Sequence, residues 1–278
     1  MPRKRSATKE DYPLAAPGYS ALMPRSLWNG TISVGLINVP VKLYTAVESK
    51  TVHFREVHLE DEGKVQHRRF CSAEDKEVPY EEVVKGYEVS RGKYVVLDKD
   101  EIAAAAGDRA HALEVEAFVE TDAIDPVFYE KTYYLGAGAK GGDAYRLLRD
   151  ALERTGRAGL GRFTFHNREY LAAVRPLDGV LALHTMRFAD EVVAGKDVEF
   201  DAPGRRPRDR EVEMAGKLVS SLHEKWNPGK RKDEYRAAVL EMIERKAAGK
   251  KPKRTREKPP EEAPDLMAAL EASLAGGK

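Results

Sequence analysis

Residues 25 to 47, RSLWNGTISVGLINVPVKLYTAV, are the stretch that decides the predicted fold. In its first half, apolar side chains at Ile32, Val34 and Leu36 alternate with small or polar ones, as in a strand with one buried face. The alternation resumes in the opposite register at Val39, Val41 and Leu43. The slip lies beside Asn38 and Pro40, and proline cannot donate within a central sheet. The stretch therefore predicts two strands joined at a bulge or sharp bend, as in a barrel.

Short strand-like runs continue from this stretch to about residue 200. They span Val52 to Leu59, Lys93 to Leu97, Leu113 to Glu120, Lys131 to Leu135, Leu160 to Phe165, Tyr170 to Val174 and Val180 to Phe188. In the third run a strand with one wet face is predicted, with its apolar face formed by Leu113, Val115, Ala117 and Val119. Short strands at this spacing are typical of a barrel or sandwich. The predicted fold class is mainly β with α.

Three segments have the periodicity of helices. The first runs from Asp143, as N-cap, to Thr155, and Gly156 ends it. The second has apolar residues every four positions, at Met214, Leu218, Leu222 and Trp226, until Asn227-Pro228-Gly229 breaks it. The third has an apolar face of Tyr235, Ala238, Val239, Met242 and Ile243. On these residues alone, the last two helices pack either on their own barrel or on another chain.

The amino-acid composition is that of a globular protein, and it does not indicate which kind of ligand the protein binds. The 278 residues are 42% hydrophobic and 33% charged, and the formal net charge is only +1. A nearly neutral chain argues against nucleic acid unless cations line one surface and acids another. Cys71 is the only cysteine, which excludes an intrachain disulfide and fits a reducing cytoplasm. No apolar run is long enough for a membrane span or signal peptide, so we expect a cytoplasmic protein.

No catalytic, cofactor or metal constellation can be assembled from the residues. The seven histidines include no His-Glu-x-x-His pair, and there is no Gly-x-Ser-x-Gly elbow. The glycine-rich segment 136–142 lacks the ending of a P-loop, and we interpret it as a surface loop. His184, within an apolar run, is predicted to be a core histidine. A lone Cys71 could be a nucleophile, but no sequence feature supports that role. The prediction is therefore no enzyme, no cofactor and no metal.

The residues resemble the prokaryotic Ku proteins, the DNA-end-binding factors of non-homologous end joining. Trp28 to Tyr44 fits the pattern Trp-x-Gly-x-Ile-x-x-Gly-Leu-x-Asn-Val-Pro-Val-Lys-x-Tyr with which those chains open. The likeness continues in order through residues 85–88, 94–97, 125–126, 131–135, 144–148, 168–171, 175–176, 190–191 and 214–226. It covers roughly Arg25 to Lys246.

This resemblance implies a β-barrel core at 25–200, with an inserted bridge at about 59–91 that encircles DNA. It also implies a helical arm at 201–246 that serves dimerisation and partner binding. Two copies would form a homodimeric ring that threads onto a broken end, binds it without regard to sequence, and recruits DNA ligase D. Such a protein would be associated with the nucleoid. Many relatives place a second cysteine three residues after the first, and this chain has Glu74 there, which puts a metal role for that loop in doubt.

Candidate contact residues follow from this reading. No recognition helix or zinc finger is present, so contacts should go to phosphates. The predicted DNA-binding residues are Lys42, Arg55, Lys64, Arg68, Arg69, Lys76, Lys93, Arg162, Arg168, Arg175, Lys250, Lys251, Lys253 and Arg254. The dimerisation residues are Met214, Leu218, Leu222 and Trp226, and the partner-binding residues are Tyr235, Val239, Met242, Leu266, Leu270 and Leu274. Arg68 and Arg69 are the residues expected to face the DNA backbone.

The two ends of the chain lie outside the resemblance. Residues 1–24 show no periodicity and are predicted to be a disordered extension. Residues 247–278 are predicted to be a basic disordered tail with a short terminal amphipathic segment, which would fold on a partner. Two rival functions stay open. One is a non-DNA β-barrel dimer that serves as a protein-binding scaffold, and the other is a small hydrolase with a histidine-containing site.

Overall fold

The computed structural model of the chain describes residues 25–105, 112–165, 168–198, 206–250 and 266–276. The chain divides into two compact units, one of residues 1–48 and 67–194 and the other of residues 49–66 and 195–278. The predicted extension at 1–24 lies outside the described residues. Among the described residues, no helix combines the length and the apolar character that crossing a membrane requires.

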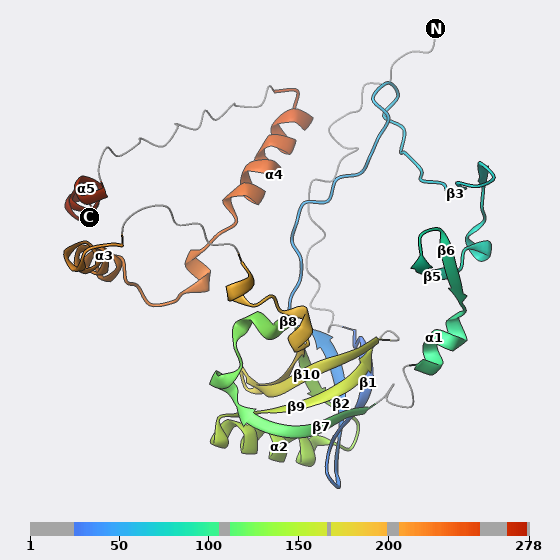
Figure 1. The fold of residues 1–278 in the computed structure, drawn as a ribbon, viewed down its shortest axis with the longest axis horizontal. Helices are drawn as coiled ribbons and strands as arrows, with labels where there is room; N and C mark the ends of the chain where they lie inside the picture. The colour runs from blue at the N-terminus through green and yellow to red at the C-terminus, as the bar shows by residue number, and fades with distance from the viewer. Residues whose placement is uncertain (1–24, 106–111, 166–167, 199–205, 251–265, 277–278) are drawn as a thin grey trace. The chain divides into compact units, whose positions relative to one another are not determined.

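The first unit is built on a closed seven-stranded barrel, which confirms the predicted barrel (Figure 1). Its strands are β1 (Trp28–Val34), β2 (Ile37–Thr45), β7 (Ala112–Glu120), β8 (Tyr129–Ala137), β9 (Arg157–Phe165), β10 (Arg168–Leu177) and β11 (Val180–Met186). They follow one another around the barrel in the order β1-β2-β8-β11-β10-β9-β7. All neighbouring pairs are antiparallel except β1 and β7, whose parallel pairing closes the ring. Closure leaves the barrel without a free edge.

The opening stretch forms the hairpin of β1 and β2, but its register slip has a different cause from the one predicted. Gly35 has φ +56°, and with the fully exposed Leu36 it forms the two-residue turn. Two-residue hairpin turns require such left-handed backbone, which glycine adopts without a Cβ clash. Pro40 belongs to β2, opposite Thr31, one residue before the pairing of β2 with β8 begins. The predicted bend at Asn38–Pro40 and the burial of Leu36 were therefore wrong, whereas Val39, Val41 and Leu43 are buried as expected.

The core of the barrel is apolar and partly aromatic. Ile32, Leu43, Leu113 and other strand residues are inaccessible to solvent. The Trp28 ring meets the Phe163 ring edge-on, with 5.9 Å between centroids. Aromatic pairs in this geometry add to the burial of area. The core thus brings together β1, the first strand of the barrel, and β9, which lies far from it in the sequence.

Helix α2 (Gly142–Thr155) packs on β2, β9 and β10. It ends as predicted at Gly156, which has φ +64°, but its N-cap is Gly141 rather than Asp143. Tyr145 and Leu152 are its buried residues. The Tyr145 hydroxyl donates to the Leu135 carbonyl (2.5 Å) and accepts from the Leu181 N–H (2.8 Å). Because Leu135 and Leu181 are opposite each other on β8 and β11, one side chain completes the pairing of two strands.

Two predicted strands differ from the observed ones. The run Val52–Leu59 forms no strand and makes only an isolated bridge between Val57 and Lys64. Its sequence suits a strand, but a strand also requires a neighbour to bond with. In β7 a bulge between Val115 and Ala117 breaks the alternation, so Ala117 is exposed rather than buried. The bulge inserts one residue at this point, so the strict alternation predicted from the sequence is interrupted at Ala117.

The chain between β2 and β7, residues 46–111, contributes no strand to the barrel in its described part. It contains two small antiparallel sheets, β3 (Phe70–Cys71) with β4 (Lys76–Glu77), and β5 (Lys85–Ser90) with β6 (Lys93–Leu97). Helix α1 (Lys99–Ala105) follows β6. The segment predicted as a bridge, about 59–91, lies within this insertion.

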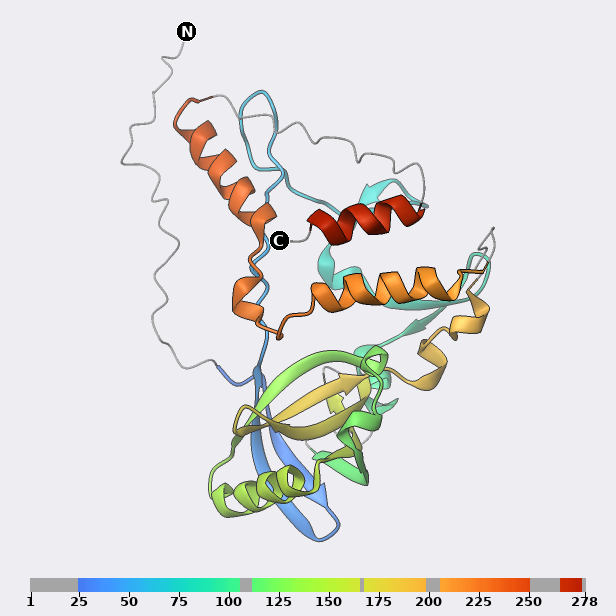
Figure 2. The same ribbon diagram turned by 90° about the vertical axis from the view of Figure 1, so that its left-hand side faces the viewer.

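The second unit contains α3 (Asp209–Ser221), α4 (Glu234–Ala247) and α5 (Leu266–Gly276). The helix predicted to reach Trp226 ends at Ser221 instead. Its last two serines donate from their hydroxyls to the carbonyls of Gly216 and Leu218. Serine hydroxyls compete in this way with backbone donors, so the helix stops although the apolar spacing continues. Figure 2 shows α5 lying along α3, against which it packs.

Candidate nucleic-acid interface

The cationic side chains around β3 and β4 are exposed, and their interactions with neighbouring side chains are weak. The Arg68 guanidinium lies 2.9 Å from the Glu77 carboxylate, and the Lys76 ammonium lies 2.5 Å from that of Glu74. The Arg69 guanidinium lies over the Tyr80 ring, 5.0 Å from its centroid. Exposed pairs of this kind contribute about 0–1 kcal/mol, so a phosphate group can replace the carboxylate at little cost. These side chains are therefore available to an anionic ligand.

Charge along the insertion is uneven. Over residues 46–111, Asp and Glu outnumber Lys and Arg, so the insertion as a whole is not cationic. No acidic residue lies between Gly63 and Glu74, and this stretch contains Lys64, Arg68 and Arg69. Contact with a polyanion is therefore favoured at residues 64–69 rather than along the whole insertion. Arg55 and Lys93 are also exposed, the latter at the start of β6.

Two of the predicted contact residues on the barrel also have acidic neighbours, and Arg162 has two. Arg162 lies between Glu116 (3.5 Å) and Glu169 (3.7 Å). Arg168 lies 3.4 Å from Glu191, with its guanidinium over the Tyr170 ring. Lys42, on β2, is exposed. A phosphate near Arg162 would also approach two carboxylates, so this position is electrostatically less favourable than residues 64–69.

Arg175 is bonded to a buried histidine. Its Nε donates to Nε2 of His184 (3.0 Å), so the ring proton is on Nδ1, which lies 3.0 Å from the Thr132 hydroxyl. Burial, and secondarily the charge of Arg175, lower the pKa of His184 to about 4. His184 is 4% exposed and neutral at physiological pH, which confirms the prediction of a core histidine.

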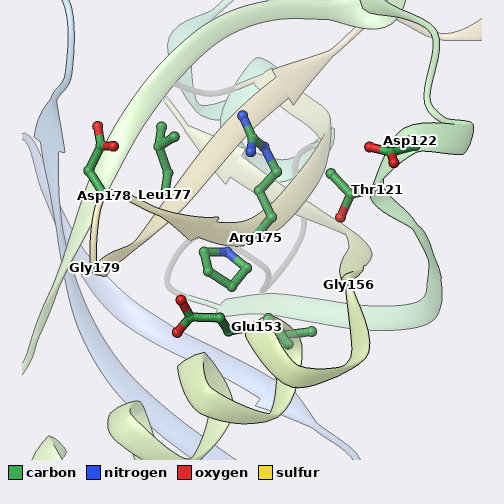
Figure 3. A pocket seen from close by; sticks show the side chains of 10 residues that line it. Thr121, Asp122, Glu153, Gly156, Arg175, Leu177, Asp178 and Gly179 are labelled. Carbon is green, nitrogen blue, oxygen red and sulfur yellow. The ribbon is translucent and has the colours of Figure 1, made fainter.

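Arg175 also lines a pocket of about 300 Å³ (Figure 3). Thr121, Asp122 and Glu153 line the same pocket, and the guanidinium points away from Glu153. Three carboxylates surround one cation here, since Asp178 is the third. The pocket therefore offers little to an anion, and Arg175 serves the packing of β10 on β11 through His184.

The predicted dimerisation residues fall into two groups. Met214 and Leu218 are half-buried within α3, whereas Leu222 and Trp226, beyond its end, are 69% and 81% exposed. The predicted partner-binding residues also divide. On α4, Tyr235 and Met242 are exposed and Val239 is buried; on α5, Leu270 and Leu274 are half-buried. The helix of Leu266 is described but its side chain is not. Lys250 is exposed, and Lys251, Lys253 and Arg254 lie outside the described residues.

A further cationic group, which the sequence reasoning missed, lies at the start of α4. Arg231, Lys232 and Arg236 line a pocket of about 600 Å³. Arg231 also pairs with Glu224, and Asp233 caps the helix by accepting from the Arg236 N–H (2.8 Å). The triplet Lys230-Arg231-Lys232 was the available signal in the sequence. It stands next to the helix break, whereas the predicted contact residues come from the strand-like runs and their connections and from the basic run that begins at Lys250.

The described residues hold no group of three or more His, Cys, Asp and Glu side chains placed to bind a metal ion. Cys71 is a free, half-exposed thiol at the end of β3. Glu74, at the position of the missing second cysteine, pairs with Lys76. The turn between β3 and β4 is thus organised by hydrogen bonds and an ion pair, including the bond from the Asp75 N–H to the Cys71 carbonyl (2.8 Å).

Comparison with known proteins gives consistent matches. The family model described as the Ku70/Ku80 beta-barrel domain matches residues 33–214. The non-homologous end joining protein Ku of Anaeromyxobacter sp. (strain K) is 43% identical over 258 residues, covering 92% of this chain and 87% of the relative. The protein of that name from Solibacter usitatus is 37% identical, covering 91% of this chain and 94% of the relative. The one from Bacillus subtilis is 34% identical, with coverage of 90% and 81%.

Proposed function

The chain belongs to the Ku family, and from that premise we propose that it binds the ends of double-stranded DNA in non-homologous end joining. One observation carries the proposal. The part of the chain that the family model matches, residues 33–214, contains a closed barrel with a long insertion between β2 and β7. The chain has no need of a cofactor in this role, because the proposed binding involves no bond making. We expect it to act in the cytoplasm, on the nucleoid.

The proposed assembly is a homodimeric ring that threads onto a broken end. A preformed ring cannot load onto closed circular DNA, so topology alone would select ends. Selection of this kind needs no residue that recognises a terminus chemically. Binding would use phosphate contacts and counterion release, and would ignore base sequence.

The phosphate contacts are proposed to centre on Arg68 and Arg69. Both belong to the stretch without acids, and their present partners, Glu77 and Tyr80, are exposed. Lys76 and Lys93, and in the other unit Arg55 and Lys64, are proposed as further phosphate contacts. The basic run Lys250 to Lys258 and the cations at the start of α4 are a second set of contacts, suited to sliding or to bridging two ends.

Dimerisation is proposed through the apolar residues of α3 and the segment after it. Leu222 and Trp226 are large, apolar and exposed, which is the usual composition of a buried interface core. Recruitment of DNA ligase D is proposed through the exposed side of α4, where Tyr235 and Met242 are accessible. Val239 is already buried and would support the helix instead of contacting the ligase.

A gel-shift comparison of linear with covalently closed plasmid, at two salt concentrations, tests the proposal. We expect retention of the linear form only, with binding that falls steeply as salt rises. Equal binding to both forms would refute threading. Binding that ignores salt would refute the phosphate contacts.

A protein-binding scaffold is the second candidate, and the acidic excess over residues 46–111 is the observation that favours it. In that case the exposed apolar side chains of β5 and β6 would contact a protein. Loss of DNA retention on reversal of Arg68 and Arg69 would count against the scaffold. Unchanged retention together with an intact dimer would favour it.

A further inference from the structure

The apolar face of α3 is already occupied within the chain. Met214, Ala215 and Leu218 on this helix are half-buried, while Val219 on its other side is exposed. Helix α5 packs against α3, and both views of the structure show the two helices side by side (Figures 1 and 2). The packing accounts for the half-burial of the α3 residues.

Helix α5 has the composition of a docked helix. It has 11 residues with Glu271 as its one charged side chain, and a helix of this length is marginal by itself in water. Met267, Leu270 and Leu274 are half-buried, whereas Glu271 and Ser273 are exposed. Apolar residues three and four apart are the anchors by which an amphipathic helix binds a groove. The formation of α5 therefore depends on the face of α3 that it covers.

The covered face belongs to the surface assigned above to the second copy. Met214 and Leu218 are half-buried on the helix that α5 packs against, whereas Leu222 and Trp226 continue the same apolar run and are exposed. We propose that α5 is an exchangeable cover of the α3 face, and that a second copy of this chain displaces it to pair there. The proposal rests on the homodimer of the proposed function. The uncovered residues would give the second copy its first contact.

Release of α5 does not separate it from the chain. Residues 248–265 connect it to α4, and 18 residues can span up to about 60 Å when extended. This connector carries the basic run Lys250 to Lys258. The helices on its two sides, α4 and α5, belong to the same unit. Displacement of α5 would therefore couple assembly to the distance over which the basic run can reach.

The size of the effect follows from mass action. A site that is open for a fraction of the time binds with an apparent Kd raised by the inverse of that fraction. If α5 covered α3 for about 90% of the time, both copies would have to open, and the apparent dimer Kd would be raised about 100-fold. At that occupancy, loss of the cover from both copies should tighten the dimer about 100-fold.

The full chain with Leu270→Glu tests the competition by sedimentation equilibrium. Ser273→Glu is the matched control, because it adds the same charge to the exposed side of the same helix. We expect Leu270→Glu to tighten the dimer and the control to leave its Kd unchanged. An unchanged Kd for Leu270→Glu would overturn the proposal. A weaker dimer would also overturn it, because α5 would then dock on the partner's α3.

A pair of labels reports on docking independently of the dimer. Cys71 is replaced by Ser, and Gly216→Cys and Ser273→Cys carry the dyes; a Cβ at Gly216 meets no atom within 4 Å. Energy transfer at dilute concentration should be high, and should fall with Leu270→Glu or with excess unlabelled chain. Transfer that excess chain leaves unchanged would overturn the exchange. If the chain is monomeric at every concentration while transfer stays high, the proposed ring fails and the competition fails with it, but docking of α5 stands.

Discussion

Replacing Tyr145 by Phe removes one oxygen atom and leaves two buried backbone groups without a partner. The hydroxyl is 2.5 Å from the Leu135 carbonyl oxygen and 2.8 Å from the Leu181 nitrogen. The side chain is 7% exposed, so water does not replace it readily. A buried group left unsatisfied costs about 1–3 kcal/mol, so two such groups predict a loss of roughly 2–6 kcal/mol in the free energy of unfolding. We expect a value near the lower half of that range, because β8 and β11 can relax toward each other.

The assay is urea unfolding followed by tryptophan fluorescence. Trp28 is buried in the barrel and Trp226, the other tryptophan, is exposed. A Trp226→Phe background makes Trp28 the sole reporter of the barrel. The midpoint should fall while the slope m stays constant. Tyr134→Phe is the control, a neighbouring half-buried tyrosine, and should change the free energy of unfolding by less than about 0.5 kcal/mol. A loss below 1 kcal/mol for Tyr145→Phe, about the cost of a single bond, would refute the bridging role of the hydroxyl.

Three further predictions concern binding, pH and packing. Replacing Arg68 and Arg69 by Glu should weaken retention of linear DNA. The magnitude of the slope of log K against log salt should fall by about 3 to 4, because a dimer would lose four cations. Gel shifts across a salt series measure this slope. Because the pKa of His184 is lowered to about 4, the folded state binds fewer protons than the unfolded state between about pH 4 and pH 6.5. Stability should therefore fall as pH drops from 6.5 to 4, by about 3 kcal/mol in total, and urea unfolding of the parent against His184→Gln measures the difference. Gly161→Ala would place a Cβ 2.0 Å from the Glu114 carbonyl oxygen, and thermal unfolding should show a loss of about 3 kcal/mol or more.

Each of these predictions has a control and a contrary outcome. Arg154→Glu on α2 is also exposed and should leave DNA retention at the parent level. If the free energy of unfolding changed with pH in the same way for the parent and for His184→Gln, the pKa of His184 would not be lowered by folding. Gly216→Ala, where a Cβ meets no atom within 4 Å, should be neutral or stabilising by up to about 1 kcal/mol. Equal effects of the two alanine substitutions would mean that the close approach at Gly161 is absent.

Local pattern determined most of the barrel strands and the first helix. Alternation placed Val39, Val41 and Leu43 in the core, and Gly156 marked the end of α2. These features depend on the spacing of side chains along an element and on backbone conformations that glycine adopts freely. Both are set by residues close together in the sequence, so they can be predicted from it. The family resemblance likewise rested on short motifs, and the barrel match over residues 33–214 confirms it.

Tertiary structure decided what depends on a distant partner. The barrel closes because Ile32 on β1 pairs with Leu113 on β7, and no local pattern contains that pairing. Val52–Leu59 has the residues of a strand but no neighbouring strand to bond with. Arg175 looked like a surface cation until the fold placed His184 beside it, and the apolar spacing of α3 looked unpartnered until α5 packed against that helix. Sequence period fixes which side of an element is apolar, whereas the partner that covers that side is chosen by contacts between residues far apart in the chain.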